Sequence, residues 1–171
     1  MSRMGKLASV VTLAVALALA LAPPAAEAQK KQIVVALNQD PDILDPTLAR
    51  TYVGRIVFSH ICEKLYEIDE KLQIQPQLAA ELPQYTDGGR TVTIKLRSGV
   101  KFNDGTAMTA ESVKFSLDRH RTLKGSNRRS ELGSIEAVEV ADPSTIRLRL
   151  KAPAAQLLAQ LTDRAGMPVS P

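Results

Sequence analysis

A strictly alternating segment in the middle of the chain constrains the fold most. Between Thr91 and Arg97, apolar and polar side chains alternate without exception. Successive side chains of a β-strand point to opposite faces, so this pattern predicts a strand with one buried and one exposed face. Turn sequences containing glycine bound it on both sides, at 87–89 and 98–99. The buried face should consist of Val92, Ile94 and Leu96.

Other segments also have strand character. Residues 135–140 and 145–150 flank a turn that contains Pro143, and the second of them alternates in the same way, which predicts a β-hairpin. The short β-branched run Gln32–Leu37 predicts a buried strand. Leu72–Leu78 should run extended, and Pro76 restricts it to a sheet edge or a link because proline cannot donate a ladder hydrogen bond.

Helical spacing appears in three places. Apolar side chains recur at helical intervals between Arg50 and Tyr66, and Thr109 is a good N-cap for a helix at 110–121. A short helix is expected at 154–161. The sequence therefore predicts an α/β or mixed α+β fold. The apolar stripe of the first helix would comprise Val53, Ile56, Val57, Phe58, Ile61, Cys62 and Leu65.

The first 28 residues are typical of a secretory signal peptide. Arg3 and Lys6 precede an apolar run, and Ala26-Glu27-Ala28 fits the small-residue cleavage pattern. The apolar run of about 16 residues is shorter than the roughly 20 that a spanning helix needs, which argues against an uncleaved anchor. We expect cleavage after Ala28 and a periplasmic protein. The leader has no cysteine for lipid attachment.

Composition excludes some classes of function. Cys62 is the sole cysteine, so no internal disulfide can form. The net charge of +4 is weak, and the basic cluster at 119–129 has no interleaved aromatic side chains, so no nucleic-acid partner is expected. No phosphate-binding glycine loop with a lysine is present, so the chain is not an ATPase.

Several residue groups have the side chains of a metal or catalytic site. Asp40, Asp42 and Asp45 share a loop, but flanking prolines make it too stiff for a calcium loop, and loop polarity is preferred. His60 and Cys62 would lie on different faces of their helix, which argues against a shared metal. No nucleophile motif accompanies the histidines. The sequence therefore predicts no catalytic residue, no metal and no cofactor.

The basic cluster Arg119, Arg121, Lys124, Arg128 and Arg129 has a simple interpretation. Cations are favourable at the C-terminal end of a helix, and the remainder of the cluster would lie in a solvated loop. Contact with a ligand is the alternative that stays open.

Three stretches together resemble the family 5 extracellular solute-binding proteins, which include oligopeptide, dipeptide and some nickel carriers. They lie at 33–69, 76–106 and 108–117, and the segment TVTIKLRSGVKFNDGTAMTAESVKFSL is long and specific. Two departures stand out: Leu82-Pro83 occupies a place where the family often has tryptophan, and Ser112 replaces a common aspartate, which should weaken helix capping.

The resemblance implies a periplasmic binding protein-like fold of type II, with two lobes around a cleft. Residues 29–171 would form only its N-terminal part. It also implies which residues contact the solute, because the segment after the first strand and the loop before the hairpin approach the cleft in the family. The candidate ligand residues are Asn38, Gln39, Arg50, Tyr52 and Arg129.

The function implied by the resemblance is the substrate-binding component of an ABC importer. Its partners would be a peptide or other small solute and a permease in the inner membrane, and the full-length protein would be a monomer. Two alternatives stay open: a secreted hydrolase, and a solute receptor or chemosensory protein of the same fold. The identity of the solute does not follow from the sequence.

Overall fold

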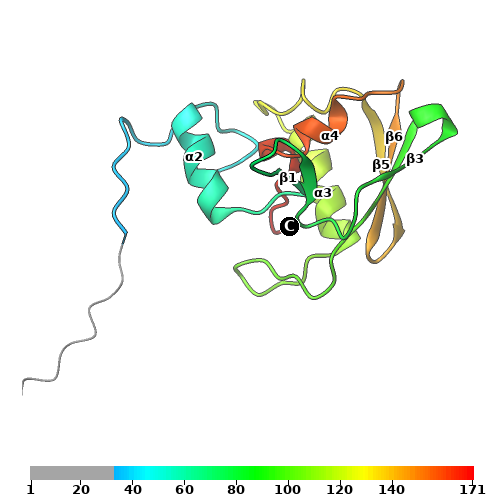
Figure 1. The fold of residues 1–171 in the computed structure, drawn as a ribbon, viewed down its shortest axis with the longest axis horizontal. Coiled ribbons are helices and arrows are strands. Elements are labelled where there is room, and N and C mark those ends of the chain that lie inside the picture. The colour runs from blue at the N-terminus through cyan, green and yellow to red at the C-terminus, as the bar shows by residue number, and fades with distance from the viewer. Residues whose placement is uncertain (1–32) are drawn as a thin grey trace, which may run out of the picture. The chain divides into compact units, whose positions relative to one another are not determined.

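The structure, a computed structural model, describes residues 33–171 (Figure 1). The predicted signal peptide, residues 1–28, lies outside the described residues. The chain divides into two units, Met1–Ala36 and Leu37–Pro171.

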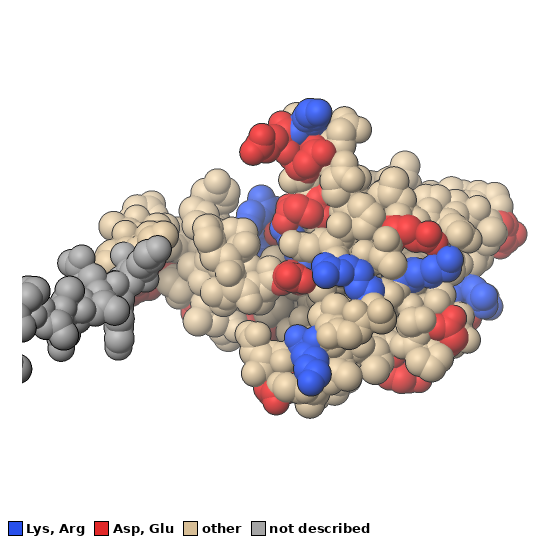
Figure 2. Space-filling model, turned by 60° about the horizontal axis from the view of Figure 1, so that its bottom comes forward, with Lys and Arg blue, Asp and Glu red and all other residues tan. Residues whose placement is uncertain are grey.

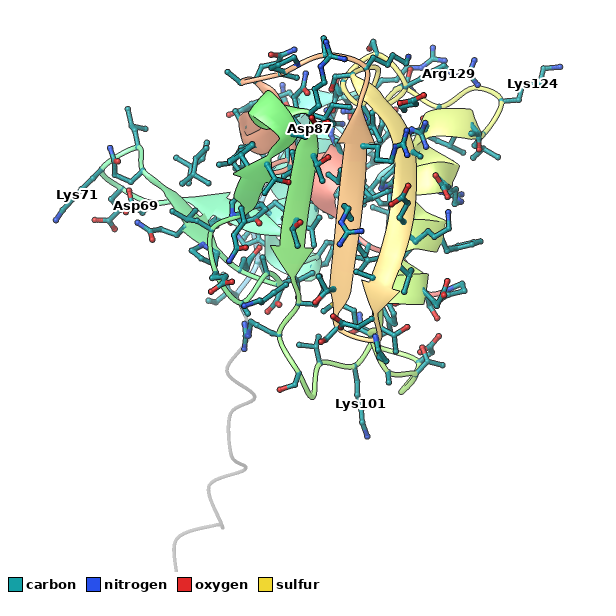
Figure 3. The ribbon with its side chains drawn as sticks, turned by 90° about the vertical axis from the view of Figure 1, so that its right-hand side faces the viewer. Asp69, Lys71, Asp87, Lys101, Lys124 and Arg129 are labelled. Atoms are coloured by element: carbon teal, nitrogen blue, oxygen red, sulfur yellow. The ribbon has the colours of Figure 1, made fainter. Side chains whose placement is uncertain are left out.

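A four-stranded antiparallel sheet forms the centre of the second unit. Its strands are β3 (Gln84–Thr86), β4 (Thr91–Lys95), β5 (Ile135–Asp142) and β6 (Thr145–Leu150), in the order β3-β4-β6-β5 (Figure 3). The predicted strand and the predicted hairpin are both confirmed. In the register, Val92 lies opposite Leu148 and Ile94 opposite Ile146, so the apolar faces of β4 and β6 coincide.

Helix α3 (Ala110–Thr122) packs on the apolar face of the sheet, and the predicted helix at 110–121 is confirmed. Val113 and Leu117 are buried there. Thr109 caps the helix: its hydroxyl accepts a hydrogen bond from the Ser112 amide, and the Ser112 hydroxyl accepts one from the Thr109 amide. Ser112 thus completes a capping box, so the expectation that it weakens capping was wrong.

Helix α2 spans Tyr52–Ile61, shorter than the predicted 50–66. The chain becomes extended at Cys62, and the unpredicted strand β1 (Tyr66–Ile68) begins four residues later and pairs with β2 (Ile74–Pro76). Phe58 is buried as expected, whereas Ile61 is 53% exposed, which corrects its assignment to the core. The end of the helix at Ile61 could not be predicted, because apolar residues continue at helical spacing past the residue at which the backbone changes direction.

The remaining elements are short. Helix α4 covers Leu157–Gln160, and two 3-10 turns, η1 and η2, cover Asp87–Gly89 and Arg164–Gly166. The predicted strand at 32–37 is wrong over its described residues: 33–37 are irregular and Ile33 is 89% exposed. A strand needs a neighbour that accepts its backbone hydrogen bonds, and none of the described strands pairs with this segment.

Candidate functional site

Two of the predicted ligand residues lie at the start of α2, Tyr52 as its first residue and Arg50 just before the N-cap, and a preceding aspartate holds this part of the chain in place. The Asp42 carboxylate accepts hydrogen bonds from the Arg50 amide at 2.8 Å and from the Thr51 hydroxyl at 3.0 Å. The Thr51 hydroxyl in turn accepts the Gly54 amide at 3.0 Å and so caps the helix. The bond from the Arg50 amide is the main cause of the lowered pKa of Asp42.

The chain just before this helix, at 45–49, is bound along its length by residues distant in sequence. The Asn127 amide donates to the Thr47 carbonyl at 3.0 Å, and the Asn127 side chain donates to the Leu48 carbonyl at 2.5 Å. The Asp45 carboxylate pairs with the Arg119 guanidinium of α3. We call residues 45–52 the clamped segment.

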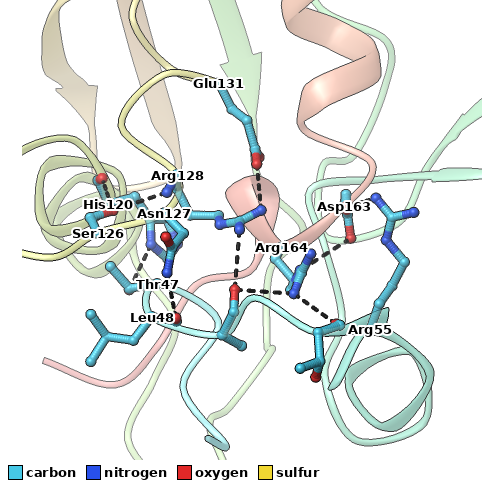
Figure 4. Close-up of polar contacts among 12 residues, drawn as sticks. Thr47, Leu48, Arg55, His120, Ser126, Asn127, Arg128, Glu131, Asp163 and Arg164 are labelled. Atoms are coloured by element: carbon cyan, nitrogen blue, oxygen red, sulfur yellow. Dashed lines mark hydrogen bonds and ion pairs between the residues drawn. The ribbon is translucent and has the colours of Figure 1, made fainter. Parts of the chain in front are cut away.

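Two buried guanidinium groups converge on one carbonyl of the clamped segment (Figure 4). The Ala49 oxygen accepts from Arg128 at 3.2 Å and from Arg164 at 3.1 Å, and Arg164 also donates to the Thr51 oxygen at 3.3 Å. The exposed fractions of Arg128 and Arg164 are only 5% and 6%. Arg128 also pairs with Glu131. Burial, followed by the nearby Arg128 charge, lowers the pKa of Arg164.

These contacts correct the simple interpretation of the basic cluster. Arg128 is a buried structural residue rather than part of a solvated loop. The Arg121 guanidinium pairs with Asp118 and donates to the Ile135 and Glu136 carbonyls of β5 at 3.0 and 2.7 Å. Lys124 is exposed, as expected. No local pattern distinguishes Arg128 from Arg129 in the sequence, so burial of one and exposure of the other could not be read from it.

The predicted ligand residues are all exposed, and three of them come from segments that meet. Arg50 and Tyr52 belong to the clamped segment, and Tyr52 is 72% exposed. Arg129 follows Arg128, which binds the clamped segment through Ala49. Its own guanidinium donates to the Thr122 and Leu123 carbonyls, both at 3.1 Å, at the end of α3.

Asn38 and Gln39 lie in irregular, exposed chain before Asp42. Among the hydrogen bonds of residues 37–171, none joins these two to Arg50, Tyr52 or Arg129. The structure thus links Arg50, Tyr52 and Arg129 through the segments that carry them, and Asp42 attaches the chain that follows Asn38 and Gln39 to the same clamped segment.

A cavity of about 810 Å³ lies at the opposite end of α2. It extends from the end of that helix to the loop at 100–104 and the chain at 168–170, and none of the five predicted ligand residues lines it. Its lining includes His60, Cys62, Phe102, Asp104 and Met108.

The acidic loop, His60 and Cys62 make contacts within the fold. Asp42 and Asp45 hold the clamped segment, and no cluster of three His, Cys, Asp or Glu side chains suited to a metal occurs within 33–171. The His60 ring donates to the Ile56 carbonyl within its own helix at 2.7 Å. Cys62 packs against the buried cluster of Ala49, Phe58 and Met167, and burial raises the pKa of its thiol.

On the face shown in Figure 2, basic and acidic side chains are interspersed rather than gathered into one patch of a single sign. Over residues 33–171, no helix has both the length and the apolar character required to cross a bilayer.

Comparison with known proteins identifies relatives of this chain. Residues 73–170 match the family model of bacterial extracellular solute-binding proteins, family 5 Middle. The glutathione-binding protein GsiB of Escherichia coli strain K12 is 33% identical over 142 residues, which make up 82% of this chain and 28% of GsiB. The chain therefore spans little more than a quarter of the length of this relative.

Solved structures of other proteins also resemble this chain. The pheromone receptor PrgZ, determined to show its mode of peptide binding, matches with a TM-score of 0.70 and 29% identity over 74% of this chain and 28% of PrgZ. AgaA from A. tumefaciens R10, in complex with agropinic acid, matches with a TM-score of 0.67 and 32% identity over 77% of this chain and 26% of AgaA.

The periplasmic murein tripeptide-binding protein MppA shares the fold, with a TM-score of 0.71 at 24% identity over 78% of this chain and 29% of MppA. The predicted periplasmic binding protein fold, present in part, is thereby confirmed. Together with the matched family model, these likenesses show that the chain belongs to the family 5 bacterial extracellular solute-binding proteins.

Proposed function

We propose that this chain is the N-terminal part of the exported substrate-binding component of an ABC importer. The observation that carries the proposal is the 33% identity to a glutathione-binding protein over 82% of the chain. Binding would close the two lobes of the complete protein over a solute, and the closed form would be the one that the membrane permease recognises. Residues 29–171 would contribute to one wall of the cleft and part of the other.

The proposed solutes are small molecules that carry carboxylate groups. The relatives are described as binding glutathione, peptide and agropinic acid, and each of these ligands bears at least one carboxylate. Arg50 and Arg129 are exposed guanidinium groups on two segments that the structure joins. A guanidinium can bind a carboxylate through two parallel hydrogen bonds. We assign the carboxylate contact to these two residues, with Tyr52, Asn38 and Gln39 as further contacts.

A receptor role is the second candidate, favoured by the likeness to a pheromone receptor. The two roles share solute binding and differ in the protein that reads the closed form. Deleting the permease genes and measuring solute uptake separates them, because only the importer role makes uptake depend on this protein together with its permease.

Titration calorimetry tests the binding itself. The protein as its gene encodes it is titrated with glutathione and with mixed di- to pentapeptides, beside the 171-residue chain. We expect saturable heat from at least one of these solutes with the gene-encoded protein and none with the 171-residue chain, which lacks most of the length of its relatives. Absence of saturable binding by the gene-encoded protein would contradict the proposed solute class, and stoichiometric binding by the 171-residue chain would contradict the two-lobe site.

Charge-removing variants locate the contact. Arg50→Gln and Arg129→Gln should each weaken binding at least tenfold, since each removes a charged hydrogen-bond donor. Lys71→Gln is the matched control: Lys71 lies at the tip of the β1–β2 hairpin, away from the Arg129 loop (Figure 3), and should leave affinity unchanged. Equal affinities for all three variants would remove both arginines from the site.

A further inference from the structure

One buried histidine holds two distant parts of the unit together. His120, in α3, has no exposed surface. Its Nε2 lies 3.0 Å from the Met167 carbonyl oxygen, and its Nδ1 lies 2.8 Å from the Thr47 hydroxyl. A carbonyl oxygen can only accept a hydrogen bond, so Nε2 carries the proton. Nδ1 of the neutral ring then accepts from Thr47 (Figure 4).

The two partners lie on opposite sides of His120 in the sequence. Thr47 is in the clamped segment, 73 residues before His120, and Met167 is 47 residues after it. A second α3 side chain strengthens the attachment of the later part, because the Ser116 hydroxyl accepts the Val169 amide at 2.9 Å. One imidazole therefore ties α3 to the clamped segment and to the chain that follows η2.

The charges around the ring disfavour a proton on Nδ1. Arg119 in α3 and Arg128 in the following loop are both cations, and Asp45 in the clamped segment is the one anion that offsets them among the groups acting on the ring. Burial is the largest cause of a lowered pKa for His120, and the two arginines add to it, against opposing contributions from the Met167 carbonyl and Asp45.

We propose that His120 is an acid-sensitive positioning residue, which holds the clamped segment in place while neutral and releases it when protonated. A proton on Nδ1 turns the acceptor for the Thr47 hydroxyl into a donor and places a cation in a buried site beside two arginines. Release of the clamped segment would move Arg50 and Tyr52. Only this last consequence rests on the proposed function, because the release itself requires no solute.

The sign of the pH dependence follows from linkage. The pKa of His120 is lower in the native protein than its ordinary value of 6.5, which the released state would regain. Attachment is therefore complete above about pH 6.5 and weakens as the pH falls from there toward the native pKa. Within that window the opening equilibrium should rise by up to about tenfold per pH unit, since one proton is taken up.

Nitrogen NMR of the imidazole rings, together with amide hydrogen exchange, tests this in the purified protein without solute. The pH is lowered from 8 to 4.5, where Asp45 stays ionised because the Arg119 hydrogen bond lowers its pKa. His60, exposed on α2, is assigned with a His60→Gln variant and serves as the comparison. We expect the Nε2–H tautomer of His120 at pH 8.

Protection factors, corrected for the intrinsic exchange rate, provide the second readout. Protection of the Asn127 and Ala49 amides, which donate to Thr47 and Asp45 carbonyls, should fall as His120 protonates. Protection in the β4–β6 ladder should stay constant, which distinguishes local release from global unfolding. Thr47→Val should lower Asn127 and Ala49 protection at every pH, and Thr47→Ser, which keeps the hydroxyl, should not.

Three results would overturn the proposal: an Nδ1–H tautomer at pH 8, protonation of His120 without loss of protection at Asn127 and Ala49, or retention of both neutral ring and protection down to pH 4.5. The NMR and exchange readouts involve no solute, so they succeed or fail independently of the calorimetry on solute binding.

Discussion

Asp45 and Arg119, 74 residues apart in sequence, form a two-point ion pair. Arg119 donates from Nη2 to Oδ2 at 2.6 Å and from Nη1 to Oδ1 at 3.0 Å. The parallel geometry is that of a guanidinium matched to a carboxylate. It fastens the beginning of the clamped segment to α3, and its two side chains are about three-quarters buried, with exposed fractions of 22% and 25%.

Asp45→Asn should therefore lower the free energy of unfolding by about 1.5–3 kcal/mol, the usual contribution of hydrogen bonds to a charged group. Asp40→Asn, in the same loop and exposed, is the control and should change it by less than about 0.5 kcal/mol. The Arg119 hydrogen bond lowers the pKa of Asp45 below 3.8, so the stability from this pair is complete above that pH and is lost as the pH falls below it. Urea unfolding at pH 7 and pH 3 measures both effects.

Substitutions in helix α2 test which of its apolar side chains lie in the core. Phe58 is 1% exposed and Ile61 is 53% exposed, so only Phe58 fills buried volume. Phe58→Ala should cost about 3–5 kcal/mol of unfolding free energy. Ile61→Asp should cost less than about 1 kcal/mol, because the new carboxylate stays in water. A large loss for Ile61→Asp in denaturant unfolding would mean that Ile61 is covered in the folded protein.

Arg128 and Lys124, two cations of the same loop, should differ in their effect on stability. Arg128→Gln removes a buried cation from the Ala49 carbonyl and from Glu131, and should destabilise the fold by about 1.5–3 kcal/mol. Lys124→Gln, on the same loop and exposed, should have no measurable effect. Thermal melting of both variants at pH 7 checks the difference, and equal melting temperatures would show that Arg128 does not hold the clamped segment.

Export is tested by the mass of the mature protein. Cleavage after Ala28 predicts a periplasmic form that begins at Gln29, measured by mass spectrometry of the periplasmic fraction. Recovery of residues 1–28 in a membrane fraction would show instead that the apolar run at 7–22 serves as an anchor.

The sequence predicts the elements whose determinants are local. The alternation at 91–97 places β4 and its buried face correctly, and Thr109 marks the start of α3. Strand β3 was missed because Gln84–Thr86 is three exposed residues with no apolar face, held in place by its pairing with β4. A pairing partner is tertiary information that a single strand does not carry.

The candidate site depends even more on tertiary contacts that a local sequence pattern does not reveal. Arg128 and Arg164 are buried because both reach Ala49, at separations of 79 and 115 residues. His120 is buried for a similar reason, through Thr47 and Met167. From composition and spacing alone, the two arginines would be predicted to be ordinary surface cations, and His120 would be predicted to be an isolated histidine. Only the folded chain brings their partners within hydrogen-bonding distance.

The contact of Arg121 with β5 has a consequence for the open edge of the sheet. Strand β5 lies at an edge of the sheet, and its pairing with β6 shifts register between Ile135 and Ala137. At that point the Arg121 guanidinium occupies the carbonyl oxygens of two consecutive residues, Ile135 and Glu136. An incoming chain would need these acceptors to extend the sheet. The irregular, cation-covered start of β5 is thus a barrier to strand addition and to the aggregation that follows from it.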